Sequence, residues 1–264
     1  MSSSLDSVCG VNSNLDLNIG QANIDPALVD SVVKDLTKLI APTFIAAAGE
    51  AFEKLKEKPD LKGVYKRSLP NHLIALNGRI SSEMLIIPFS LFPKSNPFDP
   101  SLLEERYAFD LHCLDINCID KKSSYGVLVH ALRNRLSSLE ISQLPSSVHI
   151  RFNKGHLGHT GDFWHRDSDP DKGEPRTVTI CYSNIRNWST RVLNRDDNQA
   201  IISKKTGWIT LSAEEIAAVE RVAKPSMHGF FYDGQAGLHR ASQLSDLEGS
   251  KVGVNDYRLF VRFD

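Results

Sequence analysis

Two histidines and an aspartate are the residues with the clearest chemical potential. His165 and Asp167 are separated by one residue in the segment GDFWHRDSDPD. If His165 ends a strand, alternation places both side chains on the same side of the chain, where an imidazole and a carboxylate converge. His239, which follows an Asp233-Gly234 turn between two expected strands, is the candidate second imidazole. Two histidines and one carboxylate with open positions suit non-haem iron(II).

Basic side chains near this set indicate an anion. Arg258 and Arg262 fall on one face of the C-terminal segment DYRLFVRFD, whose other face is apolar. A guanidinium binds a carboxylate through a planar, bidentate, permanently charged fork. His149, Arg151 and Asn153 form a second polar stripe in SVHIRFN, which either lines a pocket or faces solvent.

Other residues around the three candidate ligands have two readings each. Trp164 and His228 are candidates for the wall of a substrate pocket, and core packing is the alternative. His156 and His159 form an HxxH that suits zinc, although the glycines around them favour a mobile loop beside the site. Asp169 could replace Asp167 as the carboxylate ligand.

The elements that must position these residues change in character along the chain. From Asp25 the sequence is rich in Ala, Leu, Lys and Glu with helical spacing, and Pro42 should divide it into two helices. A further helix is expected over 125–139. The second half has short period-two segments separated by polar turns, namely SVHIRFN, RTVTICY, GWITL, MHGFFYD and DYRLFVRFD. Several two-faced strands of this kind predict a sandwich or barrel.

Composition limits the class of protein. The chain has 264 residues, 41% of them hydrophobic and 24% charged, with a formal net charge of −1. That is enough for one large core, and without a long basic run we expect no nucleic-acid partner. No apolar stretch approaches the ~20 residues needed to span a bilayer, and the polar N-terminus lacks the pattern of a secretory signal. The expected location is therefore cytoplasmic.

The four cysteines form no CxxC pair and are read as reduced.

The ordered set of His-x-Asp, a distant His on a late strand and an Arg on the next strand resembles the iron(II)/2-oxoglutarate-dependent dioxygenases. The similarity covers roughly 148–264. FYDGQAGLHRAS is similar to the family's segment around its distal histidine, and RLFVRF to its arginine strand. The resemblance implies an α+β fold, in which N-terminal helices pack outside a double-stranded β-helix, the jelly-roll or cupin-like barrel. Residues 1–24 would be a flexible lead to a single catalytic domain over 25–264, with a helix-rich support region (25–145) and a barrel (146–264).

The same resemblance implies the roles of the site residues. His165, Asp167 and His239 would hold Fe(II). Arg258 would bind the 5-carboxylate of 2-oxoglutarate, with Arg262 as the alternate. The activity implied is an oxygenase, most simply a hydroxylase, that uses O2 and releases succinate and CO2.

Further residues complete the expected site, and two other functions compete with it. Asn153 would assist in binding the co-substrate, and His149, Arg151, Trp164 and His228 would contact a small polar substrate such as an amino acid or natural-product intermediate. One rival is a cupin-like metal enzyme that does not use 2-oxoglutarate, and the other is a non-catalytic ligand-binding barrel. The sequence does not indicate an oligomeric state.

Overall fold

The chain folds into helices packed on antiparallel β-sheet. The computed structural model describes residues 20–61, 64–68, 80–88, 98–100, 107–113, 115–138, 144–154, 164–167, 177–185, 190–193, 211–225, 230–233, 237–241 and 256–264. Within these ranges, eight strands form one sheet and three form a smaller one, and all pairings are antiparallel.

The strands of the large sheet are, in spatial order, β1 (Gly20–Gln21), β9 (Phe230–Asp233), β6 (Val178–Ser183), β11 (Tyr257–Phe263), β5 (Val148–Lys154), β4 (Tyr107–Cys113), β3 (Ile80–Pro88) and β2 (Val64–Ser68). The small sheet contains β10 (His239–Ala241), β7 (Thr190–Val192) and β8 (Lys224–Pro225). The helices are α1 (Pro26–Glu57), the short 3-10 helix η3 (Ile116–Cys118), α3 (Ser124–Ser138) and α5 (Ala213–Val222).

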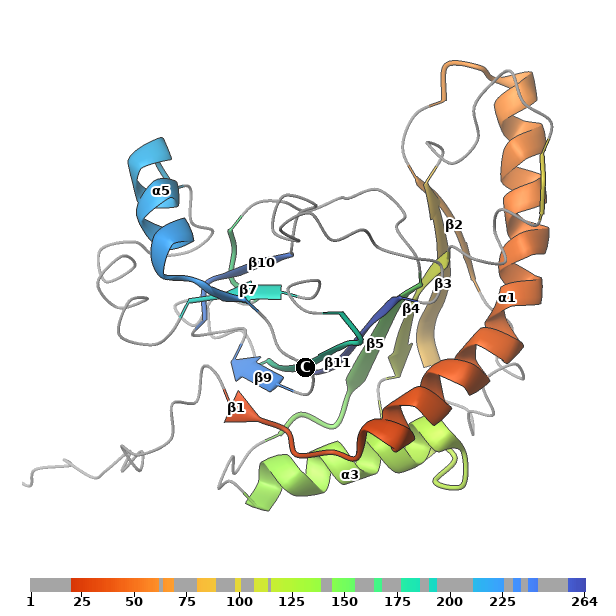
Figure 1. Ribbon diagram of the computed structural model, residues 1–264. Coiled ribbons are helices and arrows are strands. Elements are labelled where there is room, and N and C mark those ends of the chain that lie inside the picture. The colour runs from red at the N-terminus through yellow and green to blue at the C-terminus, as the bar shows by residue number, and fades with distance from the viewer. Residues whose placement is uncertain are drawn as a thin grey trace, which may run out of the picture.

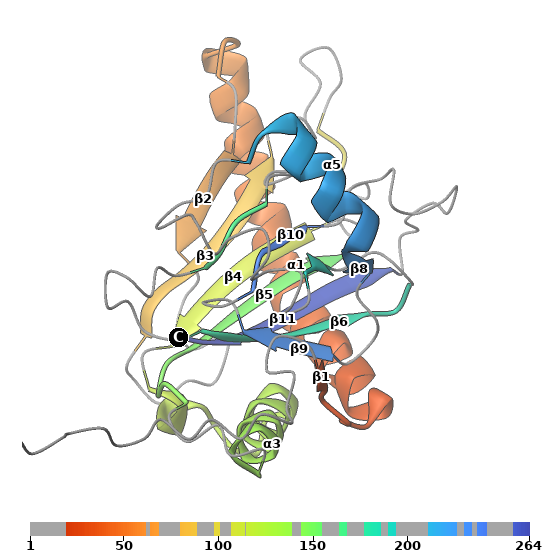
Figure 2. The same cartoon turned by 90° about the vertical axis from the view of Figure 1, so that its left-hand side faces the viewer.

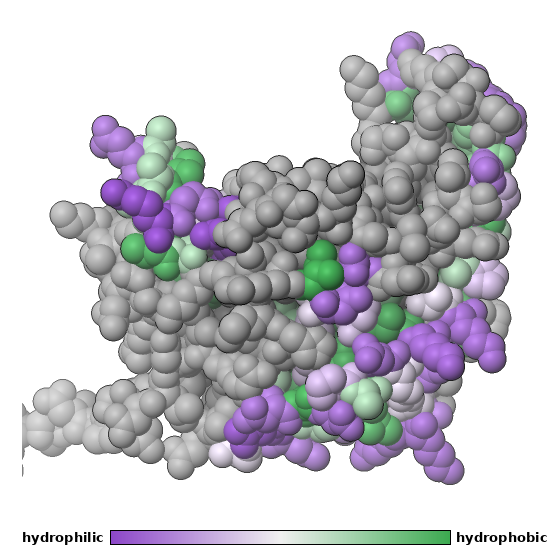
Figure 3. All heavy atoms as spheres, in the orientation of Figure 1, coloured by the Kyte–Doolittle hydropathy of each residue, from purple (hydrophilic) through white to green (hydrophobic). Residues whose placement is uncertain are grey.

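The large sheet has one face on the main core and one face toward the small sheet. Helices α1 and α3 cover the first face, whereas β7 and β10 lie on the other side of the sheet (Figure 1). Viewed from the side of the small sheet, the long strands run side by side behind it (Figure 2). Hydrophilic side chains gather over α3 and along the outer edge of α1 (Figure 3), as expected of helices that bury only their inner faces.

Strand β11 shows how alternation separates core from site. Tyr257, Leu259, Val261 and Phe263 are at most 4% exposed and belong to the main core. The alternate residues, from Arg258 to Arg262, face the small sheet. Central strands β5 and β6 behave in the same way, which confirms the two-faced pattern expected for these three segments.

The chain passes repeatedly between the two sheets. After β5 in the large sheet, His165 forms an isolated bridge to the small sheet; β6 returns to the large sheet, and β7 and β8 lie in the small one. Strand β9 is again in the large sheet, β10 in the small and β11 in the large. Segments far apart in sequence are thereby brought into facing layers.

The expectation that Pro42 divides the first helix was wrong. Helix α1 continues through Pro42, although proline lacks the N–H of one helical hydrogen bond and crowds the preceding turn. Ile40 and Phe44 on either side are fully buried, and this burial offsets the local cost. The helix bends along its length (Figure 1), as a proline within a helix would cause.

The ends of several expected segments fall outside the described residues. Residues 1–19 of the expected lead are not described, and Gly20–Gln21 pair with β9. The helix expected over 125–139 is α3. Among the described residues, no helix is long and apolar enough to cross a membrane.

A pair of glycines provides a test of helix packing. A Cβ atom on Gly126 would lie 2.0 Å from the carbonyl oxygen of Asp120, whereas one on Gly49 would meet the Phe98 ring at an ordinary 3.6 Å. We therefore expect Gly126→Ala to lower the free energy of unfolding by about 1–3 kcal/mol, the usual cost of overpacking. Gly49→Ala in α1 should be neutral or stabilise by up to about 1 kcal/mol. Urea unfolding checks both, and an equally stable Gly126→Ala would contradict the packing at the start of α3.

Candidate metal centre

His165, Asp167 and His239 lie together between the two sheets. Their ligand atoms are all within 4.8 Å of one another. The Asp167 Oδ1 atom is 3.4 Å from His239 Nε2 and 3.9 Å from His165 Nε2, and the two imidazole rings are 4.5 Å apart at an angle of 55°. The structure therefore brings together the three residues that the sequence had singled out.

Backbone pairing holds the two histidines in register. His165 and His239 donate their amide N–H groups to each other's carbonyl oxygens, both at 2.9 Å. Strand β10 in turn pairs with β7, with His239 opposite Val192. One imidazole thus stands beside the other because the two backbones form a short antiparallel bridge.

A hydrogen bond fixes the orientation of the second imidazole. The Nδ1 atom of His239 lies 3.0 Å from the carbonyl oxygen of Gly237. With the proton on Nδ1, the ring donates to this carbonyl, and its Nε2 lone pair faces Asp167. Metal-binding histidines are held in this way by an outer partner that sets the tautomer.

Electrostatics keep the aspartate ionised. Burial alone would raise the pKa of Asp167, but the neighbouring His239, together with Arg262 and His165, holds the pKa of this carboxyl well below its usual range. For His239, burial alone would lower the pKa, and the Asp167 carboxylate and the Gly237 carbonyl raise it above its ordinary value. A carboxylate and two convergent imidazoles fit a divalent first-row metal, which would supply the positive charge at this point.

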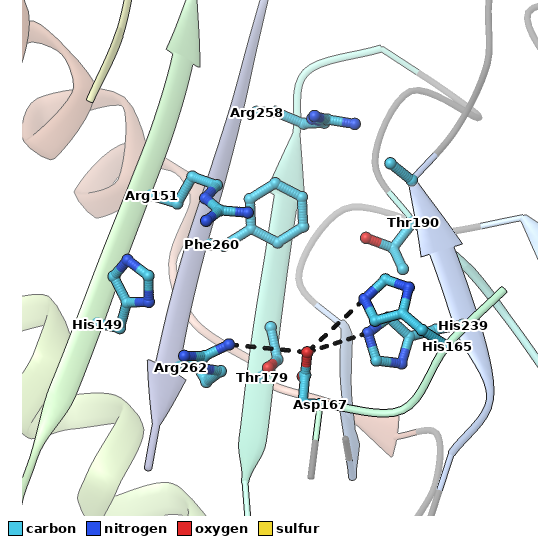
Figure 4. Close-up of a pocket in the computed structure, with 11 residues that line it drawn as sticks. His149, Arg151, His165, Asp167, Thr179, Thr190, His239, Arg258, Phe260 and Arg262 are labelled. Atoms are coloured by element: carbon cyan, nitrogen blue, oxygen red, sulfur yellow. Dashed lines mark ion pairs between the residues drawn. The ribbon is translucent and has the colours of Figure 1, made fainter. Parts of the chain in front are cut away.

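The three residues sit in a pocket whose opposite wall is strongly basic (Figure 4). In addition to them, the lining contains His149, Arg151, Thr179, Thr190, Ala241, Arg258, Phe260 and Arg262. Three of these residues are arginines, whereas Asp167 contributes the one carboxylate among the lining residues. A pocket with this balance favours a ligand with negative charge.

The two arginines of β11 lie at different levels of the pocket. Arg262 is beside the candidate ligands, with its Nη1 atom 3.7 Å from Asp167 Oδ1, and it donates to Asp264 Oδ2 from Nη2 at 2.7 Å and from Nε at 3.1 Å. Arg258 lies at the far end of the pocket (Figure 4), buried, with its guanidinium 5.1 Å from the ring of Phe260. With the Asn153 amide oxygen turned toward it, Arg258 Nη2 donates to that oxygen at 2.9 Å.

Thr179 on β6 was not singled out from the sequence. Its side chain is 3% exposed, it lines the pocket opposite Arg262, and its hydroxyl has no hydrogen-bond partner in the described structure. A buried hydroxyl without a partner is unfavourable unless a ligand or water satisfies it. Its place in RTVTICY, alternating with the buried Val178 and Ile180, was the signal that could have identified it.

The remaining expected residues have different positions. Trp164 is 5% exposed and packs with Leu193, Val219, Ala223 and Leu238 behind the site, outside the pocket lining. Asn153 also lies outside the lining, next to Arg258. The expected roles of His228, His156, His159 and Asp169 fall on residues that the structure does not describe.

Comparison with known proteins does not identify a family. No family model matches the sequence, and no curated protein matches it. Among solved structures, the crystal structure of a Pseudomonas putida prolyl-4-hydroxylase is similar to this chain, with 10% sequence identity and a TM-score of 0.32. The alignment covers 80% of this chain and 98% of the hydroxylase chain. So distant a likeness determines neither fold nor chemistry. The side chains of the site therefore have to carry the functional conclusion.

Proposed function

We propose that this protein is an iron(II)- and 2-oxoglutarate-dependent oxygenase, most simply a hydroxylase. The observation that carries the proposal is the convergence of His165, Asp167 and His239 in a pocket faced by arginines. Two imidazoles and one carboxylate leave positions open on a metal for a chelating oxo-acid and dioxygen. The arginines supply the complementary charge for such an acid.

The strand order supports a double-stranded β-helix as the scaffold. From β5 onward the chain alternates between the two sheets and ends on β11, at the centre of the large one. In a barrel wound this way, both faces of the pocket come from strands, and strands place side chains more firmly than loops do. The two histidines lie on the small-sheet side and the arginines on the large-sheet side.

We assign the 5-carboxylate of 2-oxoglutarate to Arg258. Arg262 is engaged with Asp167 and Asp264 at the level of the metal ligands. Arg258 lies four residues before it along the extended strand, a distance of about 13 Å. Arg258 would therefore hold the 5-carboxylate at the end of the pocket away from the residues that would hold the metal (Figure 4). The Asn153 amide orients this guanidinium.

Each side chain of the centre has a defined task in this proposal. When bound, iron(II) with 2-oxoglutarate supplies the activation of dioxygen for oxidation of a C–H bond, with release of succinate and CO2. Asp167 supplies an anionic ligand that remains ionised at neutral pH. The Gly237 carbonyl keeps Nε2 of His239 available. The Arg262 guanidinium, next to Asp167, holds that carboxylate in place.

The basic lining supports a proposal for the substrate class. His149 and Arg151 on β5 line the pocket next to β11, and Thr179 offers a buried hydroxyl there. We propose a small molecule with a polar or anionic group, such as an amino acid or natural-product intermediate. Arg151 and His149 would contact that group.

Anaerobic titration tests the function directly. Fe(II) should bind the metal-free protein, and subsequent 2-oxoglutarate should produce a visible metal-to-ligand charge-transfer band. Metal at about 100 times its dissociation constant should stabilise the fold by about 2.7 kcal/mol, which would raise the melting temperature until a chelator removes the metal. Iron binding without the band would favour the cupin-like enzyme. Absence of specific iron binding would contradict the proposal and favour a ligand-binding barrel.

A further inference from the structure

A single carboxylate on α5 contacts the neighbours of both histidine ligands. Glu220 Oε1 accepts a hydrogen bond from Trp164 Nε1 at 2.9 Å, and Trp164 immediately precedes His165. The same carboxylate accepts from Arg240, which immediately follows His239, through Nε at 2.7 Å and Nη2 at 2.8 Å. These contacts involve none of the residues that line the pocket.

The partners of Glu220 are themselves buried. Arg240 is 2% exposed, its guanidinium lies 5.5 Å from the Trp164 ring, and its Nη1 donates to the Ala241 carbonyl at 2.8 Å. A buried guanidinium requires a paired carboxylate, because an uncompensated buried charge is strongly unfavourable. Glu220 supplies it in a bidentate geometry, which fixes direction as well as distance.

A second arginine anchors α5 itself over the small sheet. Arg191 on β7 is opposite Arg240 in the strand register. Its Nη2 donates to the backbone carbonyls of Glu220 at 3.1 Å and Ala223 at 2.9 Å, at the end of the helix. A cation at this end also complements the helix dipole. Glu220 is therefore held from the strand that pairs with β10.

Burial alone would raise the pKa of Glu220. The hydrogen bonds from Arg240 and Trp164 and the positive charges of Arg240 and Arg191 lower it below its ordinary value. The group is consequently a carboxylate at neutral pH. It joins two segments that also meet through the backbone hydrogen bonds between His165 and His239 and through the ion pair between Asp167 and His239.

We propose that Glu220 is a positioning residue for the metal centre. It holds the backbones on either side of the site so that the two imidazoles keep the separation and angle that a metal requires. The inference rests on the proposed metal site and concerns residues that do not touch the metal. Without the carboxylate, the Arg240 guanidinium and the Trp164 indole would lose their hydrogen-bond acceptor and shift. Each shift would move the backbone of the neighbouring histidine and so displace its imidazole.

The test measures affinity for Co(II), a spectroscopically visible substitute for Fe(II), on the whole 264-residue chain. Glu220→Gln should weaken Co(II) binding at least about 10-fold, the lower end of the effect of losing an outer partner of a metal ligand. The d–d absorption bands should also change in shape. Glu214→Gln is the matched control, because Glu214 is an exposed residue of the same helix, and its affinity and spectrum should remain those of the wild type.

A double variant separates positioning from stability. Glu220→Leu combined with Arg240→Met replaces the charged pair by apolar side chains, a change that is often neutral for stability. Glu220→Gln should lower the midpoint of unfolding, because it removes the charge that compensates Arg240. The double variant should raise this midpoint again but leave Co(II) binding weak and the spectrum altered. Wild-type affinity in a folded Glu220→Gln, or recovery of affinity together with stability in the double variant, would overturn the inference. Failure of the wild type to bind Co(II) would instead remove the proposed function.

Discussion

Asp167→Ala is expected to abolish iron-dependent turnover while the chain stays folded. Asp167 is the one carboxylate of the candidate triad, and its pKa is held low, so it is the anionic ligand at neutral pH. Its removal leaves the two imidazoles without an anionic partner, and the positive charge of Arg262 lies 3.7 Å from the position of its Oδ1. Metal affinity should fall by more than about 100-fold, beyond the usual effect of an outer partner.

The measurement combines Fe(II) titration, release of succinate from 2-oxoglutarate and circular dichroism. Asp60→Ala is the matched control, because Asp60 is exposed just after α1. We expect circular dichroism spectra like that of the wild type for both variants and activity in the control alone. Undiminished succinate release by Asp167→Ala would refute the assignment of the metal centre.

Arg258→Ala is expected to raise the 2-oxoglutarate requirement strongly. Hydrogen bonds to charged groups contribute about 1.5–3 kcal/mol, which corresponds to about 10- to 150-fold in the dissociation constant. Activity at saturating 2-oxoglutarate should fall much less, because Arg258 lies far from the metal ligands (Figure 4). Iron affinity in the absence of 2-oxoglutarate should be unchanged.

Two companion variants identify the carboxylate anchor. Arg221→Ala removes an exposed arginine at the end of α5 and should leave the 2-oxoglutarate requirement unchanged. Arg262→Ala should disturb Asp167 and hence metal binding. An unchanged requirement in Arg258→Ala, with a raised one in Arg262→Ala, would transfer the anchor to Arg262.

Much of the site follows from local pattern. Alternation in a strand has a fixed period of two, so DYRLFVRFD had to place Arg258 and Arg262 on one face and Leu259 and Val261 on the other. The same rule separated His149 and Arg151 from their apolar neighbours. The hydrophobic face selects the core side, and the polar face is left for a site.

Other features depended on packing that no local pattern reveals. Pro42 predicts a break by its own chemistry, yet α1 continues because burial on both sides of the proline offsets the missing hydrogen bond. Trp164 was a candidate for the wall of the pocket, with core packing as the alternative, and it packs among buried residues. The structure turns it away toward Glu220, since the pair of neighbours in an extended segment must face opposite sides.

The sequence by itself determined which residue types and which strand faces were available for a metal and an anion, because those depend on chemistry and short-range periodicity. The tertiary structure alone decided that His165 and His239 share a backbone bridge, that Arg262 stands beside Asp167 while Arg258 lies at the far end, and that Glu220 joins both histidine segments. These are contacts between residues distant in sequence, and they are set by how the two sheets and α5 pack together.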